Sequence, residues 1–171
     1  MRFFTQEWVA ASFDEDDALL FAAYREHLNR LAARLTAPVR ELAGLSLHDG
    51  LIRRVMLCRS AKTLTLQLLC GDRQAGYFDL ELLYGRVGLD TLDTAALARR
   101  ARDRYTEILR DEIDMDKENR YVHRLLFDPE DEVEILFKDL KVIRTARRDR
   151  RLPYLKDRFR ELDWIPAPGK K

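Results

Sequence analysis

Two neighbouring segments with alternating apolar and polar residues constrain the fold of this chain more than any other feature of its sequence. Residues 63–70 place Leu64, Leu66, Leu68 and Cys70 at every second position, and residues 77–84 repeat the alternation after a loop bounded by Gly71 and Gly76. Because successive side chains of a strand point to opposite faces, each segment predicts a strand with one buried face. The short loop predicts an antiparallel pair, and residues 51–59 predict a third strand before it.

Helical periodicity predicts two long helices around these strands. Apolar residues from Leu20 to Leu35 recur at spacings of three and four and form one stripe, in a helix that opens in the acidic residues 14–17. Thr94 is expected to cap the second helix, which we expect to end within residues 111–114. Both stripes predict packing onto the sheet.

Shorter elements are expected in the C-terminal half of the chain. Residues 121–127 and 132–137 read as a hairpin, and residues 140–145 are a candidate further strand of the sheet. Pro153 suits the first turn of a C-terminal helix, and residues 164–171 are expected to form an extended tail. The sequence thus predicts an α+β fold: an antiparallel sheet of about five strands, with two long helices and a C-terminal helix packed on it.

Composition excludes several classes of protein. Hydrophobic residues make up 46% of the 171 residues, which is too many for a disordered chain, and one domain over residues 1–171 is expected. No apolar run approaches the roughly 20 residues of a membrane-spanning helix, and the first residues do not resemble a signal peptide. Cys58 and Cys70 fall out of register across the predicted strands, so no disulfide is expected and the cytoplasm is the expected location.

The formal net charge of +1 conceals two oppositely charged segments. Residues 107–119 hold six acidic and two basic residues, whereas residues 144–171 hold ten basic and four acidic ones. A solvated acidic loop and a solvated basic helix face would explain these runs. This is the usual meaning of such charge runs, and a pair of binding patches of opposite sign is the functional alternative.

No motif assembles a catalytic or metal site. The chain has no glycine-rich phosphate loop, no nucleophile elbow and no paired zinc ligands, so we expect no cofactor and a non-catalytic protein. The segment from Asp114 to Glu118 begins like a calcium loop, but Arg120 replaces the required glycine. Leu125 falls where the closing glutamate would stand, so no metal is expected.

Two alternative sites stay open. His48 and Asp49 precede a strand, and together with His123 they would supply the polar groups of a cleft in a small-molecule binder or a cryptic hydrolase. The same two residues, His48 and Asp49, are also explained by a simple turn that the Asp49 carboxylate stabilises. The second alternative is a nucleic-acid-associated factor that uses the basic C-terminal segment, with the following arginines on phosphate: Arg144, Arg147, Arg148 and Arg151.

A set of dispersed residues resembles a bacterial family of uncharacterised cytoplasmic proteins. The set comprises the start Met1-Arg2-Phe3-Phe4-Thr5-Gln6-Glu7-Trp8, the turn Leu47-His48-Asp49 before an antiparallel sheet, and the late hairpin from Phe127 to Phe137. This resemblance implies no activity. The expected architecture is also similar to that of immunity proteins, which neutralise a toxin by covering its active site.

These observations favour a non-catalytic protein-binding module, with an immunity protein as its most specific form. The partner would be another protein, such as a basic toxin domain, because segregated carboxylates suit a basic surface. Neither a membrane nor a nucleic acid is the expected partner. The expected partner-binding residues are Asp111, Glu112, Asp114, Asp116, Glu118, Asp128, Glu130 and Asp131.

Overall fold

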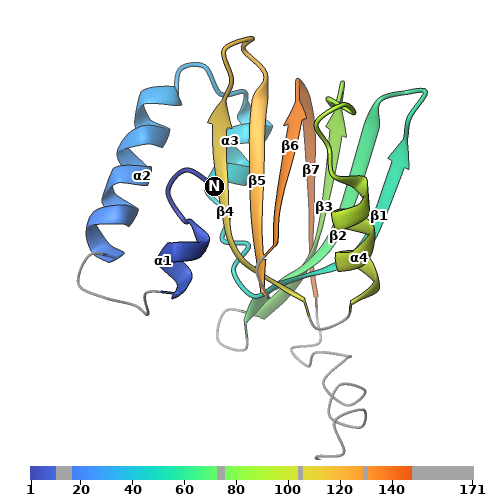
Figure 1. Ribbon diagram of the computed structural model, residues 1–171, viewed down its shortest axis with the longest axis horizontal. Helices are drawn as coiled ribbons and strands as arrows, with labels where there is room; N and C mark the ends of the chain where they lie inside the picture. Colours follow the sequence, from blue (N-terminus) through green and yellow to red (C-terminus); the bar gives the residue numbers. More distant parts are fainter. Residues whose placement is uncertain (11–16, 73–75, 104–105, 129–130, 148–171) are drawn as a thin grey trace, which may run out of the picture.

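Two packed β layers form the centre of the protein (Figure 1). The computed structural model describes residues 1–10, 17–72, 76–103, 106–128 and 131–147. Within these ranges the helices are α1 (Gln6–Ala10), α2 (Asp17–Leu31), α3 (Ala37–Ala43) and α4 (Thr94–Arg102). The strands are β1 (Gly50–Cys58), β2 (Thr63–Asp72), β3 (Gly76–Gly85), β4 (Glu107–Met115), β5 (Tyr121–Asp128), β6 (Asp131–Phe137) and β7 (Asp139–Ala146).

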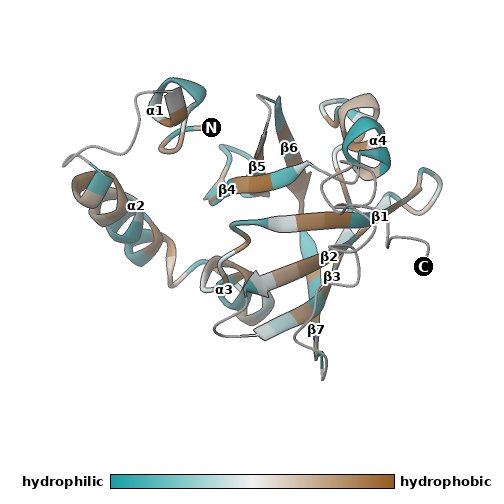
Figure 2. Ribbon diagram, turned by 90° about the horizontal axis from the view of Figure 1, so that it is seen from below, coloured by the Kyte–Doolittle hydropathy of each residue, from teal (hydrophilic) through white to brown (hydrophobic). Residues whose placement is uncertain are grey.

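The strands lie in the order β6-β5-β4-β1-β2-β3-β7, and every neighbouring pair is antiparallel. β1 and β4 pair only where Gly50 meets Ile108 and Leu51 meets Glu107. Beyond these residues the two strands diverge, so the sheet divides into a layer of β4, β5 and β6 and a layer of β1, β2, β3 and β7 (Figure 2). Lys138 alone separates β6 from β7, which joins the two layers a second time.

The hydrophobic core fills the space between the layers. Leu66 and Leu82 from one layer and Leu125 and Ile135 from the other are fully buried in one cluster. Their positions follow the period-two alternation of their strands, which places every second side chain inside. α3 contacts β7 and β4, and α4 contacts β1 and β6, so these two helices close openings between the layers.

The two layers differ in what covers their outer faces. The N-terminal segment and α2 lie against the outer side of the β4–β6 layer (Figure 1). Phe4 is the centre of this packing, with its ring 5.2 to 5.3 Å from the rings of Trp8, Phe21 and Tyr24. No described helix lies across the outer face of the other layer, which we call the open face (Figure 2).

The prediction of an α+β fold with an antiparallel sheet is confirmed, but its details change. The sheet has seven strands in the described residues rather than about five, and residues 139–146 form the expected further strand. The two long helices are shorter than predicted, because the first ends at Leu31 and the second at Arg102. The predicted C-terminal helix and the tail at residues 164–171 lie outside the described residues.

The main error concerns residues 107–115, which form β4 instead of a helix end and an acidic loop. Ile108 and Ile113 are both fully buried, and a register shift between Ile108 and Arg110 places them on the same inner face. The bulge hides the period-two pattern in the sequence, because one extra residue breaks the alternation.

In the part of the chain that the structure describes, no helix has the length and apolar character needed to cross a membrane.

Gly50, at the joint between the layers, offers a test of this topology. A Cβ at Gly50 would lie 2.7 Å from the Leu47 carbonyl oxygen, whereas one at Gly44 would have its nearest neighbours at 3.5 Å. We therefore expect Gly50→Ala to lower the free energy of unfolding by about 1–3 kcal/mol, the usual cost of overpacking. Gly44→Ala should change it by less than about 0.5 kcal/mol. Urea unfolding of both variants measures this, and equal effects would contradict the layer joint.

Candidate functional site

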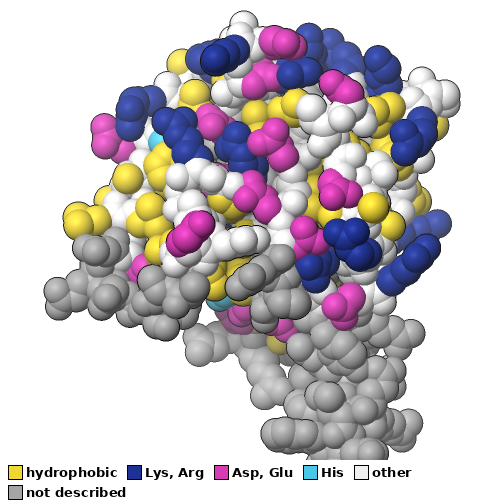
Figure 3. Space-filling model, viewed as in Figure 1, with side chains coloured by type: hydrophobic (Ala, Val, Ile, Leu, Met, Phe, Trp, Pro, Cys, Tyr) yellow, Lys and Arg dark blue, Asp and Glu magenta, His cyan; other side chains and the backbone are white. Residues whose placement is uncertain are grey.

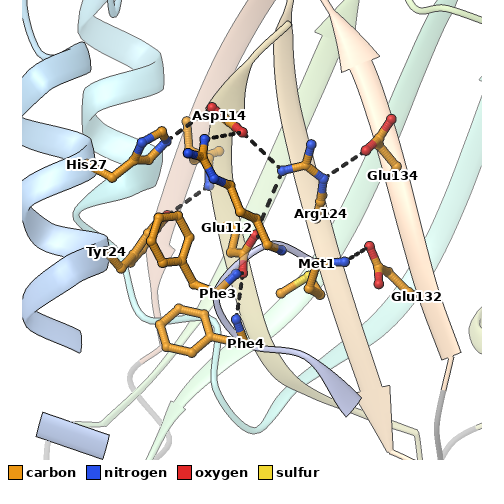
Figure 4. Close-up of polar contacts among 12 residues, drawn as sticks. Met1, Phe3, Phe4, Tyr24, His27, Glu112, Asp114, Arg124, Glu132 and Glu134 are labelled. Carbon is orange, nitrogen blue, oxygen red and sulfur yellow. Dashed lines mark hydrogen bonds and ion pairs between the residues drawn. The ribbon is translucent and has the colours of Figure 1, made fainter. Parts of the chain in front are cut away.

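Glu112, one of the predicted partner-binding residues, is the most deeply buried carboxylate of β4, with 1% of the residue exposed. It lies on the outer side of the strand, where the N-terminal segment covers it (Figure 4). The backbone N–H of Phe3 and that of Phe4 donate to one carboxylate oxygen at 2.6 and 2.7 Å, and the N–H of Arg2 donates to the other at 2.9 Å. Hydrogen bonds to an ionised acceptor are among the strongest in proteins. Glu112 therefore anchors the chain's own N-terminal segment.

Asp114 performs the same task for α2. Its carboxylate lies 3.1 Å from His27 Nε2 and 3.3 Å from a guanidinium nitrogen of Arg124, whose Nε donates to Glu134 at 2.8 Å (Figure 4). Burial raises the pKa of Asp114. The N–H of Met115, together with His27 and Arg124, lowers it by a larger amount, so the pKa lies below its ordinary range.

Two more contacts fix α2 and the N-terminal segment to the β4–β6 layer. The hydroxyl of Tyr24 on α2 accepts the backbone N–H of Ile113 at 2.8 Å, and burial raises the pKa of this tyrosine. The N-terminal amine pairs with Glu132 on β6. Two of the predicted partner-binding residues, Glu112 and Asp114, are thus occupied by contacts with the N-terminal segment and α2.

The remaining predicted carboxylates are dispersed. Asp116 accepts the backbone N–H groups of Glu118 and Arg120 in a turn and pairs with the Arg120 side chain at 2.6 Å. Asp131 pairs with Arg99 and Arg100 on α4. Glu118 alone among the described members of the set has a largely exposed side chain, at 72%. Nothing is described for the Asp128 side chain or for Glu130.

The prediction of a solvated acidic loop is therefore wrong. Figure 3 shows charged side chains of both signs interspersed over the face that includes the β4–β6 layer, with no continuous acidic patch. The physical reason is that antiparallel pairing sets Arg124 of β5 directly opposite Glu112, where its guanidinium also lies 3.3 Å from Asp114. A linear count of charge cannot show this pairing.

The alternative cleft does not assemble either. His48 is exposed and its Nδ1 lies 2.9 Å from the carbonyl oxygen of Leu109, beside a hollow of about 40 Å³ that Trp8 also lines. His48 Nε2 lies 3.4 Å from Asp49, which adopts the positive φ of 61° expected in a turn. His123 is fully buried in the core. The structure therefore does not bring the three side chains together.

The environment of His123 is a row of polar groups between the layers. Its Nδ1 lies 2.8 Å from the hydroxyl of Tyr84, and its Nε2 lies 3.4 Å from a carboxylate oxygen of Asp111. Burial raises the pKa of Tyr84, and it raises that of the neighbouring Cys70 thiol to about 12. With Tyr84 1% and His123 0% exposed, the row is closed to a substrate, and His123 Nε2 forms no hydrogen bond with any described residue.

Two arginines of the basic segment lie in its described part, and one of them is paired with a carboxylate. Arg147 pairs with Asp79 on β3 at 3.0 Å, and the Arg144 guanidinium lies 4.0 Å from the ring centre of Phe78. Arg148 and Arg151 lie outside the described residues. Internal pairing of Arg147 counts against the nucleic-acid alternative, because phosphate contacts need unpaired basic groups on one surface.

The open face carries the larger feature that the sequence did not reveal. A hollow of about 430 Å³ lies over β1, β2, β3 and β7. Charged and polar side chains surround it, with Ile143 36% exposed beside them. The alternation in β2 and β3 predicted that these polar side chains point outward, but it did not predict that no described helix would cover them. Its polar and apolar lining residues include Arg53, Arg54, Gln67, Asp79, Glu81 and Ile143.

Comparisons with known proteins found no relatives. No family model matches the chain, and neither a curated protein nor a solved structure is significantly similar to it. The resemblance to an uncharacterised bacterial family therefore stays a prediction. Within the described residues, no group of three histidine, cysteine, aspartate or glutamate side chains is placed to hold a metal ion.

The anchoring role of Glu112 predicts a large loss of stability on truncation. Glu112→Ala leaves three backbone N–H groups without their acceptor and Arg124 without one of its carboxylates. We expect the free energy of unfolding to fall by about 3 kcal/mol. The matched control Glu118→Ala removes an exposed carboxylate from the same segment and should change it by less than about 0.5 kcal/mol. Equal losses in chemical denaturation would contradict the anchor.

Asp114 predicts a specific pH dependence. Because its pKa is lowered in the folded protein, its contribution to stability is complete above the ordinary aspartate pKa, about 3.9, and is lost as the pH falls through the lower folded value. The difference in free energy of unfolding between the wild type and Asp114→Asn should therefore be largest near neutral pH and shrink in strong acid. A difference that stays constant down to acidic pH would show that its carboxylate charge is not involved.

Proposed function

We propose that this protein is a non-catalytic binding module whose partner protein docks on the open face. The observation that carries the proposal is the contrast between the two layers. The N-terminal segment and α2 cover the β4 side of one outer face, whereas the other presents the hollow of about 430 Å³. Protein interfaces combine an apolar centre with a polar rim, and arginine is enriched in them.

The charges of the open face define the chemistry of the partner. Asp79 lies between two arginines, with Arg53 and Arg147 both 3.0 Å from its carboxylate. Arg54 and Lys141 are exposed and form no ion pair with any described residue. A partner that presents carboxylates around an apolar centre would pair with Arg54 and Lys141 and cover Ile143. Such complementarity mainly raises the association rate and selects among partners.

An immunity protein is a narrower form of this proposal, in which the partner is a toxin. Its support is the α+β architecture alone, since the carboxylates expected to meet a basic toxin domain are used inside the fold. If the toxin docks on the open face, an acidic surface of the toxin would contact Arg54 and Lys141.

Site-specific cross-linking tests where the partner docks. A photo-reactive amino acid at Ile143 on the open face should capture a protein in the native host. The same group at Leu19, which is 69% exposed on α2, should not capture that protein. Capture of the same protein from Leu19 alone would contradict the open face as the docking surface.

Charge reversal tests the chemistry with the captured partner in purified form. We expect Arg54→Glu to weaken its binding about tenfold in calorimetry, since losing one ionic contact and adding repulsion costs about 1.4 kcal/mol. The matched control Arg25→Glu makes the same charge change at an exposed site on α2 and should leave the dissociation constant unchanged. Equal weakening by both variants would show that the change in net charge, and not a contact of Arg54, lowers the affinity.

A further inference from the structure

A second hollow lies where the two layers diverge. After Leu51, β1 no longer pairs with β4, and α4 closes the opening by contacting β1 on one side and β6 on the other (Figure 1). The helix is fixed toward β6, because Arg99 and Arg100 both pair with Asp131. On the β1 side, a groove of about 310 Å³ stays open between the helix and the strand.

The lining of this groove is almost entirely apolar. Val55 and Leu57 come from β1, and Leu97, Ala98 and Ala101 come from α4. Leu97 is fully buried, whereas Ala98 is exposed, so the groove runs from the core to the surface. Small-molecule sites have volumes of roughly 300 to 1,000 Å³ and mostly apolar walls with a few placed polar groups.

Arg102 supplies the charged group at one end of the groove. It is the last residue of α4, its side chain is exposed, and it forms no ion pair with any described residue. This distinguishes it from Arg99 and Arg100, which both pair with Asp131. An apolar groove that ends at a guanidinium without an ion pair among the described residues is complementary to an alkyl chain that ends in a carboxylate.

We propose that the groove between α4 and β1 binds an amphiphile of the fatty-acid class. The alkyl chain lies along Val55, Leu57 and Ala98, and the carboxylate meets Arg102 at the surface. This site shares no lining residue with the hollow of the open face, so the inference stands independently of the proposed function.

Titration with decanoate, below the concentration at which it forms micelles, tests the proposal. Chemical-shift changes of the full-length protein should map to α4 and β1 and should saturate. Ala98→Trp fills the groove at an exposed position and should weaken binding at least about tenfold. Its unfolding curve, compared with that of the wild type, verifies that the variant is folded. Absence of saturable shifts, or undiminished binding by the folded Ala98→Trp variant, would overturn the site.

Arg102→Glu tests the head group separately. It should weaken decanoate binding about fivefold, as expected for a partly exposed ion pair, and leave the binding of decanol unchanged. The control Arg25→Glu makes the same charge change at an exposed site on α2, away from the groove, and should alter neither. Equal effects of Arg102→Glu on decanoate and decanol would overturn the role of the guanidinium and reduce the groove to a general apolar site.

Discussion

The buried carboxylate of Glu112 is the interaction on which the arrangement of the molecule depends. An ionised side chain is costly to bury unless it is paired and hydrogen-bonded, and three consecutive backbone N–H groups meet this requirement. They come from residues 2–4, so the anchor determines where the chain begins its path across the β4–β6 layer. The rings of Phe3 and Phe4 then pack against Tyr24, which places α2 beside the strand.

Covering one layer leaves the other available for binding. The N-terminal segment and α2 use the acidic strand internally, and α3 and α4 close the openings between the layers. The open face is the surface that these contacts leave uncovered, and it combines the exposed Ile143 with Arg54 and Lys141, which form no ion pair within the described part of the chain. The proposed docking surface is therefore a consequence of how the fold buries its carboxylates.

Local patterns predicted much of this fold. Alternation from Leu64 to Cys70 and from Phe78 to Tyr84 identified β2, β3 and their buried faces, since the period of two depends on the strand alone. β4 was missed because its bulge breaks the alternation and because six carboxylates within residues 107–119 suggested exposure. The N–H groups of residues 2–4 that bind Glu112 come from the other end of the chain, and only the tertiary structure brings them to β4. Arg124 reaches Glu112 and Asp114 from the neighbouring strand β5.

Amide hydrogen exchange at Arg2, Phe3 and Phe4 tests most directly whether the acidic strand is an internal anchor. Exchange reports how often a hydrogen bond opens, so anchored amides share the protection of the element that holds them. We expect these three amides to exchange as slowly as that of Ile113 in β4, and to lose this protection in the Glu112→Ala variant. If the three amides of the wild-type protein exchange at the rate of an unstructured chain, the account is contradicted, and Glu112 does not hold the N-terminal segment on β4.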